Sequence, residues 1–132
     1  MSASPCLAHG CAACCYATET LVSEADVRRL EGAGHRREDF VVVGADGLAG
    51  LRNVTGGDGR ERCVFLKDDR CSVYADRPEG CRAYPLTLAE GSLRVMRDPD
   101  CPWRQEFPLD PAAGRRLRVL VATVLREGRK RA

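Results

Sequence analysis

The chain has 132 residues, of which 44% are hydrophobic, and its formal net charge is +2. This length predicts a single domain over residues 1–132, and the apolar fraction is that of an ordinary globular protein. Because no stretch approaches the roughly 18 apolar residues of a membrane span and the first residues lack the apolar core of a signal peptide, we expect a cytoplasmic protein without a membrane partner.

Residues 1–17 predict a loop rich in cysteine, with Cys6, Cys11, Cys14 and Cys15. The spacing C-x4-C-x2-C of the first three is that of plant-type iron–sulfur proteins, which add one distant cysteine. Cys11 and Cys14 alone would also form one knuckle of a structural zinc site. Since both metals accept thiolates in tetrahedral geometry, the spacing does not choose between zinc and an iron–sulfur cluster.

A short helix is predicted next, over about residues 23–32. Ser23 is a favourable N-cap, and Asp26 three residues later gives the pattern of a capping box. Val27 and Leu30 supply a narrow apolar face, and the glycines that follow are stop signals.

The middle of the chain predicts strands and hairpins. Residues 40–59 (FVVVGADGLAGLRNVTGGDG) predict one or two strands cut by glycine-rich turns. Residues 62–78 predict a hairpin in which CVFL and CSVY flank KDDR, and residues 86–96 (LTLAEGSLRVM) a second hairpin that turns at Glu90–Gly91. His35, which precedes these segments, is expected to be exposed.

The C-terminal segment predicts a long helix over residues 110–131. Asp110 would cap it, Pro111 suits its first position, and apolar residues then recur at helical spacing. Basic residues gather near its C-terminal end, where cations are favoured: Arg126, Arg129, Lys130 and Arg131. They predict a solvated helix end; the alternative is a contact with an acidic protein partner.

Four more cysteines bring the total to eight, and they come from three later segments: Cys63, Cys71, Cys81 and Cys101. In a reducing compartment thiols favour metal binding or catalysis, and a disulfide framework or inert core thiols are the alternatives. A metal held by both groups would staple the N-terminal loop to the hairpin region. Because neighbouring side chains usually diverge, Cys14 and Cys15 are expected to serve different metal atoms or different edges of one cluster, unless one is a small buried core residue.

Buried thiolate centres carry negative charge that needs compensation. Arg77 and Arg82 flank Cys81, and a guanidinium donates several hydrogen bonds to sulfur. We therefore expect Arg82, and less strongly Arg77, to balance this charge; the alternative is a surface ion pair with Asp76 or Glu79. Eight thiolates with two divalent ions would change the formal charge of the chain from +2 to −2, so the charge is a poor argument for nucleic acid.

These residues resemble the YkgJ-type cysteine-cluster family, the CxxCxxCC proteins, which are described as zinc- or iron-chelating domains. Beside Cys11, Cys14 and Cys15, the family pattern C-P-F-L, C-x-I-Y-x-x-R-P and C-R-x-Y/F-P is matched by Cys63, Phe65, Leu66, Cys71, Tyr74, Arg77, Pro78, Cys81, Arg82, Tyr84 and Pro85. The resemblance covers about residues 6–103. It departs at Val64, where the family often has proline, and in the four residues between Cys6 and Cys11, where the family usually has two.

Together these features predict a small α+β domain, rich in cysteine and stapled by metal, with short hairpins, one short helix and a C-terminal helix. We predict metal binding by all eight cysteines, as zinc or an iron–sulfur cluster in one or two centres. The alternatives are an iron–sulfur electron-transfer or redox protein and an accessory or catalytic module of a methyltransferase-like enzyme, since this cluster type also occurs in larger proteins resembling flagellin lysine N-methylases. No G-x-G-x-x-G motif or Ser-His-Asp set supports an enzyme, and the basic tail lacks the interleaved aromatics of a single-strand platform.

Overall fold

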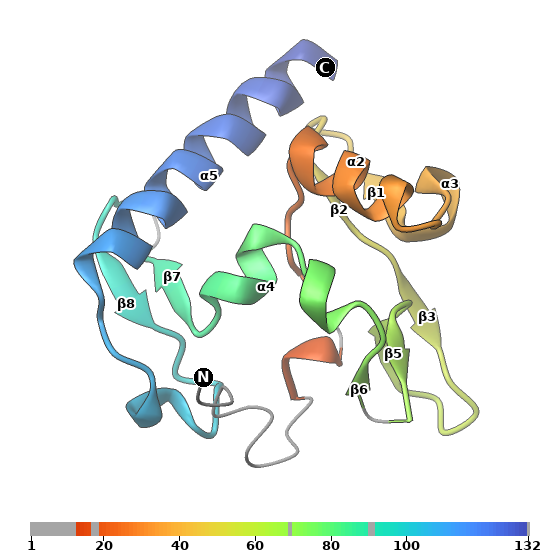
Figure 1. The fold of residues 1–132 in the computed structure, drawn as a ribbon, viewed down its shortest axis with the longest axis horizontal. Coiled ribbons are helices and arrows are strands. Elements are labelled where there is room, and N and C mark those ends of the chain that lie inside the picture. The colour runs from red at the N-terminus through yellow and green to blue at the C-terminus, as the bar shows by residue number, and fades with distance from the viewer. Residues whose placement is uncertain (1–12, 17–18, 69, 90–91, 132) are drawn as a thin grey trace.

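A computed structural model describes residues 13–16, 19–68, 70–89 and 92–131 of the chain, with short helices and four strand pairs around a central helix (Figure 1). The helices are η1 Ala13–Cys15, α2 Glu24–Gly32, α3 Arg37–Phe40, η2 Tyr74–Asp76, α4 Glu79–Ala83, η3 Arg104–Glu106 and α5 Pro111–Arg131. The strands are β1 Val41–Val43, β2 Ala49–Leu51, β3 Asn53–Thr55, β4 Glu61–Cys63, β5 Leu66–Lys67, β6 Arg70–Cys71, β7 Leu86–Leu88 and β8 Val95–Arg97. The predicted α+β class is confirmed, and α3 and α4 are short helices beyond the one expected.

Among the described residues, the strands form four separate two-stranded antiparallel sheets, each pairing strands that follow one another in the chain. Figure 1 shows α4 near the centre, α5 on one side with β7 and β8, and α2 and α3 on the other. Because no sheet is large enough to build a core alone, the packing between these small units sets the fold.

The capping box predicted for α2 is confirmed. The Asp26 backbone N–H donates to Ser23 Oγ and the Ser23 N–H donates to the Asp26 carboxylate, each at 3.1 Å. Val27 and Leu30 are buried, as expected from the apolar face. The helix ends at Gly32, and Gly34 adopts a φ of +102°, which favours glycine.

The hydrophobic core lies between α2, the first two hairpins and the segment that follows them. Its buried members are Val22, Val27, Leu30, Phe40, Ala49, Leu51, Cys63, Phe65 and Val73. The Phe40 and Phe65 rings lie 5.5 Å apart, and His35 meets Phe65 edge-on at 5.0 Å. The expectation of an exposed His35 is therefore wrong, because this aromatic contact half-buries the ring.

The hairpin predicted over residues 62–78 forms around the expected turn but is shorter. Only β5 and β6 pair, with Leu66 opposite Cys71, whereas Cys63 lies in β4 opposite Asn53 of β3. The Val64 N–H donates to the Arg52 carbonyl at 2.9 Å, so this stretch is bound to an earlier segment. Residues 40–59 hold three strands rather than one or two; the second hairpin, β7–β8, is confirmed, with its expected turn outside the described residues.

The predicted C-terminal helix is also confirmed, as α5. The Asp110 carboxylate accepts the Ala112 N–H at 3.0 Å, and Gly114, Leu117, Val124 and Gly128 are buried on its inner face. This face packs on α4 and β7. In the part of the chain that the structure describes, no helix has both the length and the apolar character needed to cross a membrane.

The far end of α5 reaches α2. Glu127 accepts the Glu24 backbone N–H at 2.9 Å, while Arg131 donates to the Gly47 carbonyl at 3.0 Å and lies 3.5 Å from the Glu24 carboxylate. The helix therefore joins the two sides of the domain.

We expect Leu117→Ala to lower the free energy of unfolding by about 2–4 kcal/mol, because it leaves a cavity beneath α5. The Leu117 side chain is 7% exposed, whereas Val119 two residues later is 67% exposed. Urea denaturation should therefore show little change for Val119→Ala, and equal loss in both variants would mean that α5 does not pack on the domain through this face.

Candidate metal centre

Six of the eight predicted ligand cysteines lie in the part of the chain that the structure describes, and all six are free thiols: Cys14, Cys15, Cys63, Cys71, Cys81 and Cys101. They come from η1, β4, β6, α4 and the segment after β8. Cys6 and Cys11 fall outside the described residues.

The backbone brings the N-terminal segment onto the later strands. Tyr16 forms an isolated antiparallel bridge with Arg62, which sets the neighbouring positions, Cys15 and Cys63, side by side. The guanidinium groups of Arg60 and Arg62 lie 3.8 and 5.1 Å from the centre of the Tyr16 ring. The bridge therefore places the described N-terminal cysteines beside β4; that the two cysteine groups share a metal stays a prediction.

Helix α4 carries Cys81 into the same region. Its Sγ lies 3.8 Å from Thr20 Oγ1. A β-carbon at position 80 would lie only 3.0 Å from Thr20 Cγ2, so Gly80 permits this close approach. Pro78 precedes the helix as its N-cap.

Cys14 and Cys15 contact each other. The Cys15 thiol donates a hydrogen bond to the Cys14 sulfur, and this bond is the main cause that lowers the pKa of Cys14 to about 7. The same bond, with burial, raises the pKa of Cys15. The two sulfurs therefore lie close together at η1; that they serve different metal atoms or different edges of one cluster stays a prediction.

The other three thiols lie within electrostatic reach of this pair. Burial is the first cause that raises the pKa of Cys63, Cys71 and Cys81, the last to about 12. Negative charge on Cys14 raises all three values further. Five sulfur atoms from four segments of the chain are thus close enough that ionisation of one thiol disfavours ionisation of its neighbours.

Arg77 supplies positive charge to this cluster. Burial raises the pKa of Cys71, and the Arg77 guanidinium partly opposes that rise; it also adds to the lowering of the pKa of Cys14 that the hydrogen bond from Cys15 mainly causes. The guanidinium is held 3.7 Å over the Tyr74 ring while donating to the Tyr74 carbonyl at 2.9 Å. Arg82 is exposed and donates to the Ala75 carbonyl at 2.9 Å. We expected Arg82 to balance the thiolate charge more than Arg77. In the structure Arg77 is the arginine near the sulfurs, because Arg82 lies on the outer side of α4.

Cys101 is buried, with 4% of its surface exposed, and it approaches the cluster through Tyr84. The pKa of Tyr84 is raised first by burial, next by a hydrogen bond with the Asp98 carboxylate, and then by charge on Cys101 and Cys14. Tyr84 therefore lies within electrostatic reach of both Cys101 and Cys14.

The gathered thiols are not a closed set of ligands. Among the residues that the structure describes, no three Cys, His, Asp or Glu side chains are arranged to hold one metal ion. The donor chemistry nevertheless fits zinc or iron, because both are bound by clustered thiolates in proteins. The negative charge that these partly buried thiolates would carry is the charge that a metal cation compensates.

Sequence reasoning missed the part that Thr20, Tyr84 and Asp26 play in this region. Thr20 belongs to no ligand pattern, and Tyr84 matched the family pattern without a role being assigned to it. Asp26 was predicted only as a helix cap, yet its carboxylate also accepts the Glu79 N–H at 3.2 Å and so fixes the start of α4. The family pattern at Tyr84 and the capping pattern at Asp26 were the signals in the sequence; Thr20 gave none.

Comparison with protein families gives one match, over residues 5–105, to the family described as "CxxCxxCC: Putative zinc- or iron-chelating domain". The match spans all eight cysteines and ends before α5. Comparisons with curated proteins and with solved structures found no match.

Proposed function

The chain belongs to the CxxCxxCC family of zinc- or iron-chelating domains, and on this premise we propose that its cysteine thiolates hold zinc or iron in a centre that staples the fold. The observation that carries the proposal is the gathering of five thiols from η1, β4, β6 and α4. Cys14 and Cys15 are far in sequence from Cys63, Cys71 and Cys81, so a shared metal ion would join the N-terminal segment to the rest of the fold and add its binding free energy to folding.

We assign the ligands from this arrangement. Cys14, Cys15, Cys63, Cys71 and Cys81 would bind the metal, with Arg77 offsetting the charge of their thiolates. A second centre or a larger cluster would be completed by Cys101, which lies beside Tyr84, and by the N-terminal Cys6 and Cys11. Arg82, on the outer side of α4, would contribute little to balancing the charge. Zinc would give structural stability, whereas an iron–sulfur cluster would add redox chemistry.

An iron–sulfur redox protein is the second candidate. It is favoured by one observation, the spacing C-x4-C-x2-C of Cys6, Cys11 and Cys14. The contact between Cys14 and Cys15 adds a fifth nearby sulfur, more than a single four-thiolate zinc centre uses.

Purification without oxygen, followed by elemental analysis, tests the proposal and separates the two candidates. Zinc at up to about two ions per chain, with a colourless protein, would identify thiolate zinc centres. Iron with acid-labile sulfide and visible absorption would identify a cluster. A protein that carries neither metal, and binds neither on reconstitution with zinc or with iron and sulfide, would overturn the proposal.

We further propose that residues 1–132 form a single domain in the cytoplasm. The contacts of α5 with α4, β7 and α2 support one folding unit, and a reducing compartment would keep the six described thiols free for metal.

A further inference from the structure

Positive charge is concentrated on α5. This helix holds seven basic residues and one acidic residue, a formal charge of +6, whereas the whole chain carries +2. The remainder of the chain is therefore net −4. The basic residues are all exposed: Arg115, Arg116, Arg118, Arg126, Arg129, Lys130 and Arg131.

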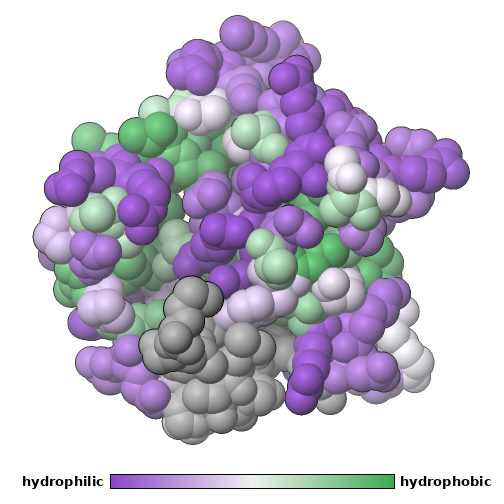
Figure 2. Space-filling model, viewed as in Figure 1, coloured by the Kyte–Doolittle hydropathy of each residue, from purple (hydrophilic) through white to green (hydrophobic). Residues whose placement is uncertain are grey.

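Apolar side chains are exposed among these charges. Val119 is 67% exposed and Leu125 43%, both on α5. Leu93 and Leu109, in the segments before β8 and α5, are 67% and 50% exposed. Hydrophilic residues dominate the region around the C-terminal end of α5, and apolar patches show elsewhere on the same face (Figure 2).

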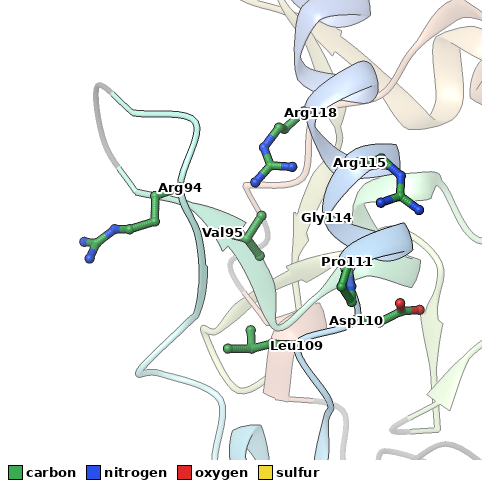
Figure 3. A pocket seen from close by; sticks show the side chains of 8 residues that line it. All are labelled: Arg94, Val95, Leu109, Asp110, Pro111, Gly114, Arg115 and Arg118. Carbon is green, nitrogen blue, oxygen red and sulfur yellow. The ribbon is translucent and has the colours of Figure 1, made fainter.

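A pocket of about 330 Å³ lies between β8 and the first turns of α5. Its apolar lining includes Val95, Leu109 and Pro111, and Gly114 lets the helix approach so closely that a β-carbon there would lie 3.1 Å from Val95 Cγ2. Figure 3 shows Val95, Leu109 and the Arg118 guanidinium on one side of the start of α5. Arg118 is held there by donating to the Leu93 carbonyl at 2.8 Å.

We propose that this α5–β8 surface, made of the pocket and the exposed face of α5, docks an acidic protein segment that places one apolar side chain in the pocket. An apolar centre with a charged rim is the anatomy of a protein interface. The excess of basic over acidic residues along α5 gives charge complementarity to carboxylates. The surface lies outside the family match at residues 5–105 for most of its length, so it goes beyond the metal-binding function.

Two other polyanions fit the surface less well. Nucleic acid would bury Val119 and Leu109 against phosphates, and α5 has no aromatic residue on which a base would stack. An anionic membrane would require a broader apolar face than these separated side chains provide.

The test measures binding of the metal-loaded full chain to a fluorescent glutamate-rich peptide that carries a single leucine. We expect binding at physiological ionic strength, weakened about tenfold when the leucine of the peptide is replaced by alanine. Leu109→Ser should weaken binding of the leucine peptide and leave the alanine peptide unchanged. The double variant Arg115→Gln with Arg126→Gln should weaken both peptides about tenfold.

The matched control removes two exposed guanidinium groups elsewhere, Arg28→Gln with Arg36→Gln, whose side chains are 77% and 73% exposed. It should leave peptide binding unchanged. The proposal is overturned if neither peptide binds, if the control weakens binding as much as the α5 variant, or if a DNA duplex or phosphatidylglycerol vesicles bind more tightly than the leucine peptide. The proposal is also overturned if the chain self-associates and this self-association disappears in the α5 variant. The occupant of the surface would then be a second copy of the chain.

Discussion

Cys81→Ser should remove most of the bound metal and lower the melting temperature by about 10 °C or more, which corresponds to about 3 kcal/mol of lost stability. Cys81 comes from α4, the element nearest the middle of the fold, and it shares electrostatic contacts with Cys14, Cys63 and Cys71. A serine hydroxyl stays protonated at neutral pH and is a hard donor, so it does not replace a thiolate on zinc or iron. The metal would then join fewer segments of the chain.

The measurement is metal content per chain, together with thermal unfolding of the wild type and the variant before and after chelation. Ala83→Ser is the control, since it adds the same side chain to the same helix at a half-buried position. If Cys81→Ser kept the metal content and the melting temperature of Ala83→Ser, Cys81 would not be a ligand. If chelation lowered the stability of Cys81→Ser as much as that of the wild type, the metal would be bound without α4.

Patterns confined to neighbouring residues predicted the local structure well. The Ser23–Asp26 capping box, the β7–β8 hairpin and the start of α5 at Pro111 all follow from interactions within a few residues. The pairing of β4 with β3 instead of β6 did not follow, because burial of Phe65 and the bond from Val64 to the Arg52 carbonyl depend on tertiary packing.

The candidate site shows the same division. Cysteine spacing and the family resemblance indicated which residues would gather, but not how they face one another. The contact between Cys14 and Cys15 depends on the turn of η1. The packing of α4 against Thr20 and α5 decides which side of α4 faces outward. This orientation in turn decides which arginine lies near the sulfurs. No spacing along the chain encodes either arrangement.

The sequence predicted Asp26 only as part of a helix cap, but in the structure it also connects two segments of the fold. Its carboxylate is 1% exposed and accepts hydrogen bonds from the Ser23 N–H, the Glu79 N–H and the Arg29 guanidinium. Arg29 also donates to the Arg77 carbonyl at 2.7 Å. One buried carboxylate thus links the start of α2 to the segment that carries both Arg77 and α4.

We expect Asp26→Ala to lower the free energy of unfolding by about 3 kcal/mol, because it leaves two backbone N–H groups and a partly buried guanidinium without their acceptor. Glu31→Ala removes a carboxylate from the same helix, where it meets Arg37 at the surface at 3.3 Å, and should cost less than about 1 kcal/mol. Urea denaturation of the metal-loaded proteins measures both. Asp26→Ala should also release metal faster than Glu31→Ala, since α4 loses the acceptor that fixes its first turn; equal stability and equal release in the two variants would show that α4 is positioned without Asp26.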